Sequence, residues 1–123
     1  MLDASALLAL LFGEAGSDSI PATSGEAMIS TVNYAETISV TVRRGVPLAD
    51  VRRQLSRLVL DIVEFGSESA ELTGTLIENT KSHGLSLGDR ACLAEARRRG
   101  VPALTADKAW KDLDIGVTIQ FIR

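Results

Sequence analysis

Four acidic residues stand among apolar neighbours, each close to a point where one element of structure ends and the next begins. They are Asp3, Glu36, Asp89 and Asp107. An unpaired carboxylate is costly to bury, so a fold must either leave these groups in solvent or gather them around a cation. Carboxylate oxygens are ligands that divalent cations such as Mg²⁺ prefer. If the four acids meet in space, we expect a divalent metal and chemistry on phosphate.

Short apolar segments alternate with segments of helical spacing along the chain. Strands are predicted over residues 27–30, 60–65, 101–104 and 117–122, with Met1 and Leu2 as the stub of a first strand. Helices are predicted over residues 5–12, 31–44, 47–58, 67–83, 86–99 and 107–110. This alternation predicts an α/β fold with a mainly parallel sheet.

The predicted elements place the acids where a shared site would need them. Asp3 and Asp107 follow strands, Glu36 lies in the second turn of a helix that follows a strand, and Asp89 lies in the first turn of its helix. Ligands of open α/β sheets bind outside the carboxyl ends of the strands. One site containing all four carboxylates is therefore compatible with the pattern.

Three of these acids also have a purely structural interpretation as helix caps. Asp3 and Asp107 precede predicted helices, and Asp89 stands three residues after Ser86, the spacing of a capping box. A carboxylate has two oxygens, so a cap and a metal ligand are compatible.

Glu36 has no capping interpretation. It falls in one helical row with Val32 and Val40, which predicts a partly apolar face for its side chain. A solvated glutamate is more often found on the polar face of a helix.

Composition excludes several classes of protein. The 123 residues suit one domain, predicted over 1–123, and 46% are apolar. No apolar run approaches the roughly 20 residues needed to cross a bilayer, and no basic segment precedes the first apolar run, so a cytoplasmic location is expected. The only cysteine, Cys92, is expected to be buried and structural. There is no P-loop, no dinucleotide-binding glycine motif and no zinc spacing.

The order and spacing of several motifs resemble those of a known family. LDASALLALLFGE, ISTVNYAE and GLSLGDRACLAEARRRGVPALTADKAW cover most of the chain and are similar to the PIN-domain nucleases, specifically to VapC toxins of toxin–antitoxin pairs. The resemblance implies a three-layer α/β/α sandwich with a short parallel sheet. One difference is that only Met1 and Leu2 precede Asp3, where the family usually has a longer first strand.

The resemblance also implies site residues and partners. The family's acidic quartet corresponds to Asp3, Glu36, Asp89 and Asp107, with Thr105 and Ser5 supporting them. We expect Asp3 and Asp89 to bind Mg²⁺ or Mn²⁺ directly, and Glu36 and Asp107 directly or through water. The implied activity is RNA cleavage, and the implied partners are an RNA substrate, a cognate antitoxin and a second copy in a homodimer.

Three other functions remain open from the sequence. A receiver-like phosphoacceptor domain also gathers acids at strand ends, but it would carry paired acids early in the chain. A PIN module that only binds RNA or a protein partner would have lost part of the quartet. A metal-dependent phosphatase or DNase would use the same carboxylates on another substrate.

Overall fold

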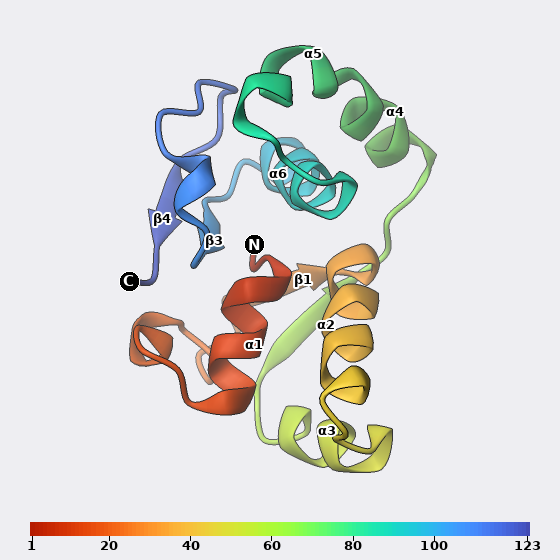
Figure 1. Cartoon of the computed structure of the whole chain (residues 1–123), viewed down its shortest axis with the longest axis vertical. Coiled ribbons are helices and arrows are strands. Elements are labelled where there is room, and N and C mark those ends of the chain that lie inside the picture. Colours follow the sequence, from red (N-terminus) through yellow and green to blue (C-terminus); the bar gives the residue numbers. More distant parts are fainter.

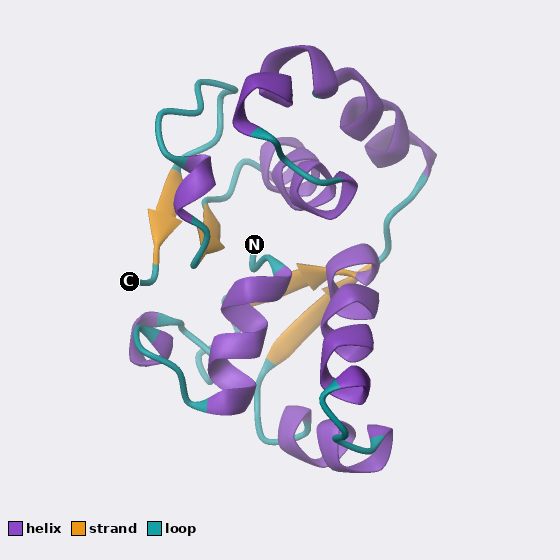
Figure 2. Cartoon of the chain, in the orientation of Figure 1, coloured by secondary structure: helices purple, strands orange, loops and turns teal.

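The computed structural model describes residues 1–123 and contains one parallel sheet covered by helices (Figures 1 and 2). In chain order the elements are α1 (Ala4–Phe12), the 3-10 turn η1 (Ser17–Ser19), β1 (Ala27–Ser30), α2 (Thr31–Arg43), α3 (Leu48–Leu55), β2 (Leu60–Val63), α4 (Ser67–Thr75), α5 (Ile77–Thr80), η2 (Lys81–His83), α6 (Leu87–Arg99), β3 (Ala103–Thr105), η3 (Lys108–Trp110) and β4 (Ile119–Phe121).

Leu2 joins the two strand pairs into one sheet. β1 pairs with β2 and β3 with β4, both in parallel. Leu2 makes parallel bridges to Ile29 on one side and to Leu104 on the other. The order across the sheet is therefore β2, β1, the Leu2 stub, β3 and β4, which confirms the predicted parallel sheet.

The short first strand is held from both sides. The Leu2 amide donates to the Met28 carbonyl at 2.7 Å, and the Asp3 amide donates to the Leu104 carbonyl at 3.0 Å. The Leu104 amide in turn donates to the Met1 carbonyl at 2.8 Å. A central position compensates for the shortness of this strand, because both of its edges are paired.

Successive residues of each strand enter different cores, as the pleat requires. Met1 belongs to a core formed with α6, η3 and the α4–α5 segment, whereas Leu2 belongs to a core formed with α1. Ala103 and Leu104 divide in the same way. Figure 1 shows α4, α5 and α6 at the top and α1, α2 and α3 below. This arrangement confirms the predicted three-layer α/β/α sandwich.

The prediction of one continuous helix over residues 67–83 is wrong. The segment forms α4, α5 and η2 in succession, and its N-cap is Gly66. Gly74 and the β-branched Thr73 and Thr75 are poor helix formers that cluster at the break. The interruption turns Leu76 into the core, where it is 1% exposed.

The ends of other elements also differ from the prediction. Pro47 caps α3 from outside the helix, which ends at Leu55 rather than at residue 58. β2 ends at Val63 rather than at residue 65, and β4 spans only Ile119–Phe121. Apolar character continues past the hydrogen-bonded part of these elements, so the sequence overestimates their length.

Gly16 is a point where two distant segments touch. Its φ is +89°, and a Cβ built on it would lie 1.9 Å from the carbonyl oxygen of Ile122. Next to this contact, the Arg123 guanidinium donates to the Ala15 carbonyl at 3.1 Å. The last strand is thereby held against the loop that follows α1.

A Gly16→Ala variant is expected to lose about 3 kcal/mol of stability or more, because the added methyl would overlap the Ile122 carbonyl in addition to straining the backbone. Gly45→Ala is the matched control: Gly45 has a φ of +87° but nothing within 4 Å of the added Cβ, so only the conformational cost of about 1 kcal/mol applies. Urea unfolding measures both. Equal losses would contradict the proposed contact.

Candidate metal centre

The direction in which the chain crosses the sheet reverses next to Asp3. From Leu2 the chain proceeds outward to β1 and β2, and it then returns to β3 on the other side of Leu2. In parallel α/β sheets, ligands bind at such a reversal, outside the carboxyl ends of the strands. Asp3 directly follows Leu2, and Asp107 lies two residues after β3. These two acids therefore lie at the reversal.

Asp3 is 3% exposed, and both of its carboxylate oxygens are hydrogen-bonded. Oδ1 accepts from the Ala6 amide at 2.8 Å, which confirms the capping interpretation. Thr105 Oγ1 donates to Oδ2 at 2.6 Å. Ser5 Oγ lies 2.7 Å from Oδ1 and 2.9 Å from Oδ2, so its proton can serve either oxygen. One lone pair can be released to a cation while Ser5 stays bonded to the other oxygen.

Ser5 and Thr105 also hold the loop that carries Asp107. The Ala106 amide donates to Ser5 Oγ at 2.8 Å, and the Asp107 amide donates to Thr105 Oγ1 at 2.9 Å. Each hydroxyl accepts from this loop and donates to Asp3, so the loop position depends on the Asp3 carboxylate. Asp107 Oδ1 caps η3 by accepting from the Ala109 amide at 2.9 Å, and Oδ2 has no protein partner.

Asp89 is half-buried in the first turn of α6 and forms the predicted capping box with Ser86. The Ser86 amide donates to Asp89 Oδ2 at 2.9 Å, and the Asp89 amide donates to Ser86 Oγ at 3.1 Å. Oδ1 has no protein hydrogen bond. The cap thus uses one oxygen and leaves the other for a ligand.

Glu36 extends toward the first turn of α6 from α2. The row of Val32, Glu36 and Val40 is only partly buried, and the Glu36 side chain is exposed. The neighbouring row is the buried one, and it is polar: Asn33, Thr37 and Thr41. The Glu36 carboxylate extends over the first turn of α6, where a Cβ on Gly88 would lie 2.7 Å from its Oε2.

Burial and mutual repulsion both act on these carboxylates. Burial is the main reason that the pKa of Asp3 is raised to about 6, and the charge of Asp89 raises it as well. The hydrogen bonds from Thr105, Ala6 and Ser5 lower this pKa and offset part of the rise. The pKa of Glu36 is raised by burial and then by Asp89. Burial also raises the pKa of Asp89, the Ser86 hydrogen bonds lower it, and the Asp107 charge raises it.

Asp89 therefore interacts electrostatically with each of the other three acids. No three of them converge closely enough to enclose an ion by themselves. Mg²⁺ commonly binds through one or two carboxylates and keeps several waters, so an open set of hard oxygen donors fits it. The unbonded Asp89 Oδ1 and Asp107 Oδ2 are suitable donors, and a cation beside the acids would favour their charged forms, which burial and mutual repulsion disfavour.

Comparison with known proteins identifies the family. The sequence model of the PIN domain matches residues 1–116. This chain belongs to the PIN-domain family. Its members are generally nucleases and usually require a divalent metal. The comparison with curated proteins found no match.

Two solved structures share the fold of this PIN domain. One is a toxin–antitoxin complex from Klebsiella pneumoniae, 21% identical, with a TM-score of 0.73, covering 95% of this chain and 93% of that one. The other is a DNA-bound VapBC from Salmonella typhimurium, 19% identical, with a TM-score of 0.75, covering 100% of this chain and 97% of that one. At these identities the likeness establishes the fold. No helix of this PIN domain is long and apolar enough to cross a membrane.

The sequence interpretation missed two residues at this site, Asn33 and Gly88. Asn33 is 1% exposed and donates through Nδ2 to the Gly88 carbonyl at 3.0 Å. The signal for it is a row of small polar residues at helical spacing, Asn33, Thr37 and Thr41, which is a reason to expect a buried polar contact. Gly88 carries no comparable signal.

The raised pKa of Asp3 predicts how stability depends on pH without metal. Between its ordinary value of 3.8 and about 6, the folded protein holds a proton that the unfolded chain has released, so stability falls as pH rises. Asp3→Asn should lack this loss. In EDTA, the wild type should therefore lose roughly 3 kcal/mol relative to the variant between about pH 4 and pH 7.

Urea unfolding of both proteins across that range measures the difference. A constant difference in unfolding free energy would show that the pKa of Asp3 is not raised by folding. A wild type that gains stability relative to the variant as pH rises would show that the folded protein stabilises the Asp3 carboxylate.

Proposed function

We propose that this PIN domain is a Mg²⁺- or Mn²⁺-dependent endoribonuclease that acts as the toxin of a toxin–antitoxin pair. The observation that carries the proposal is the arrangement of Asp3, Glu36 and Asp107 around Asp89 at the reversal of the sheet. Membership in the PIN-domain family supports nuclease chemistry. The two solved relatives are toxin–antitoxin complexes by description, which supports the toxin role.

In this proposal the metal is held by Asp3 and Asp89, with Glu36 and Asp107 binding directly or through water. When bound, the ion polarises the scissile phosphate and lowers the pKa of the attacking water. The residues of the chain provide position: Ser5 and Thr105 orient the Asp3 carboxylate, and the capping box orients Asp89. Glu36 is the most exposed of the acids and is free to orient or deprotonate the water.

Asp89→Asn is expected to lower RNA cleavage at least about 100-fold, because it removes a proposed metal ligand and the charge that interacts with all three other acids. The fold should persist, since an amide oxygen can still accept from the Ser86 amide. Cleavage of a panel of single-stranded and structured RNAs, with Mn²⁺ restored after EDTA treatment, measures the effect. Asp61→Asn, an exposed change on β2, is the matched control and should retain activity.

Full cleavage by Asp89→Asn would contradict the proposed metal site. Wild-type activity that survives chelation would contradict it as well. Cleavage of DNA in preference to RNA would assign the same site to a DNase.

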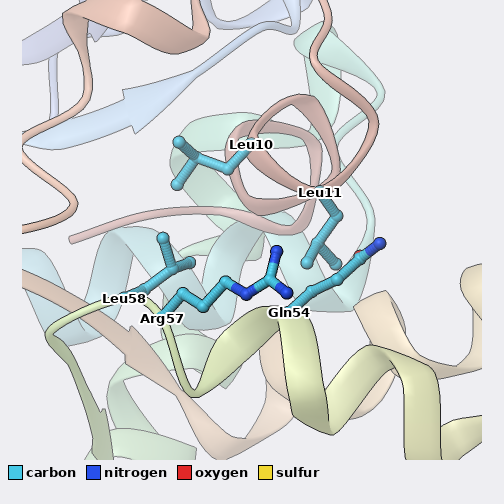
Figure 3. Close-up of a pocket in the computed structure, with 5 residues that line it drawn as sticks. All are labelled: Leu10, Leu11, Gln54, Arg57 and Leu58. Carbon is cyan, nitrogen blue, oxygen red and sulfur yellow. The ribbon is translucent and has the colours of Figure 1, made fainter.

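A groove between α1 and α3 supports the antitoxin part of the proposal. Figure 3 shows Leu10 and Leu11 of α1 facing Gln54, Arg57 and Leu58 at the end of α3 and in the turn after it. These five residues line a cavity of about 260 Å³. An apolar floor with a cation at its edge suits an amphipathic segment that carries an acidic residue. We infer that the antitoxin binds here.

Arg57→Glu should weaken antitoxin binding about tenfold or more without lowering RNA cleavage, because it reverses the charge at the edge of the groove. Arg52→Glu, at an exposed arginine within α3, is the control. The measurement is co-purification and titration with the cognate antitoxin. Equal binding by both variants would place the antitoxin elsewhere on the toxin.

A further inference from the structure

Asn33 connects the helix that carries Glu36 to the helix that carries Asp89. Its Nδ2 donates to the Gly88 carbonyl at 3.0 Å, and its Oδ1 accepts from Ser30 Oγ at 2.8 Å. The amide orientation is fixed by this pattern, because a carbonyl can only accept. Ser30 Oγ also caps α2 by accepting from the backbone N–H of Asn33 at 3.2 Å. The carbonyl oxygen and one N–H of the side-chain amide are thus bonded at the junction of α2 and α6.

Gly88 leaves space for the Glu36 carboxylate. A Cβ at position 88 would lie 2.7 Å from Glu36 Oε2 and 3.4 Å from its Cδ, and no other atom comes closer than these. Gly88 is not among the glycines with positive φ, so the backbone does not require a glycine there. The absence of a side chain therefore serves the neighbouring carboxylate and not the turn.

We propose that Asn33 and Gly88 are positioning residues that fix the Glu36 carboxylate beside Asp89. Asn33 sets the distance between the first turns of α2 and α6, and Gly88 provides the surface against which the carboxylate lies. The consequence for catalysis rests on the proposed nuclease function, whereas the geometric consequence does not.

The structure explains why Glu36 needs such support. Asp3, Asp89 and Asp107 each have at least one oxygen fixed by a backbone amide at a helix end. Glu36 has no such cap, and its longer side chain extends from an exposed position of α2. Without Asn33 and Gly88, nothing would hold its carboxylate next to Asp89, because like charges repel.

The first test is Gly88→Ala, since only the end of a flexible side chain must move to accept the methyl group. Cleavage should fall roughly 10- to 100-fold through kcat, with KM little changed, because a displacement of about 1 Å at a reacting group has effects of this size. The unfolding midpoint should not fall, because alanine favours a helix more than glycine. Gly74→Ala in α4, where nothing lies within 4 Å, is the matched control and should keep full cleavage.

A measurement that does not depend on RNA cleavage tests the position of the Glu36 carboxylate separately. The NMR signals of the Glu36 side chain should shift in metal-free Gly88→Ala and stay in place in Gly74→Ala. Unchanged Glu36 signals together with full cleavage would overturn the proposal. Shifted signals with unchanged cleavage would remove the catalytic part of the proposal, and would leave the contact.

Asn33→Ala gives a second, independent test. It should shift the Glu36 signals and lower kcat in the same direction as Gly88→Ala, and the double variant should lose less than the product of the single losses, because both changes act through one carboxylate. Multiplicative losses would show that the two residues act on different groups. If the wild type cleaves no RNA, the proposed nuclease function fails, and the NMR shifts still decide the positioning of Glu36.

Discussion

The buried Asp3 carboxylate is the group on which the candidate site depends. It follows a two-residue central strand and caps α1. It also accepts hydrogen bonds from the hydroxyls of Ser5 and Thr105. Those hydroxyls also accept from the amides of the loop that carries Asp107. The first strand, the first helix and the loop after β3 are therefore oriented by one side chain. A carboxylate this buried is costly to ionise, and its many hydrogen bonds lower that cost only in part.

The cost of ionising buried carboxylates also explains why the proposed site includes a cation. Each of the four acids is placed by ordinary elements of the fold, three by helix caps and one by the α2–α6 junction. Burial is the main cost of ionising Asp3, Glu36 and Asp89, and repulsion among the acids, in which Asp89 takes part each time, adds to it. The raised pKa values of these three groups mean that their charges lower the stability of the metal-free fold. The cost is understandable if a divalent ion and a phosphate complete the site in the working protein.

The sequence predicted what depends on local chemistry. The caps at Asp3, Asp89 and Asp107, the buried Cys92 and the parallel α/β pattern are all confirmed, because capping and periodicity act over a few residues. The break at Leu76 was missed because poor helix formers lower helix stability without fixing where a helix ends. The roles of Asn33 and Gly88 could not be predicted from the sequence, because they depend on a contact between residues 55 positions apart. The assignment of the four acids as metal ligands stays a prediction.

The most direct test of the proposed cation site is the pKa of Asp3, measured by NMR with and without Mg²⁺. Without the ion the carboxyl should titrate near pH 6, well above its ordinary value of 3.8. Saturating Mg²⁺ should lower this pKa, because a cation beside the carboxylate favours the charged form. A pKa near its ordinary value in the metal-free protein, or one that does not respond to Mg²⁺, would contradict a cation site built on this buried acid.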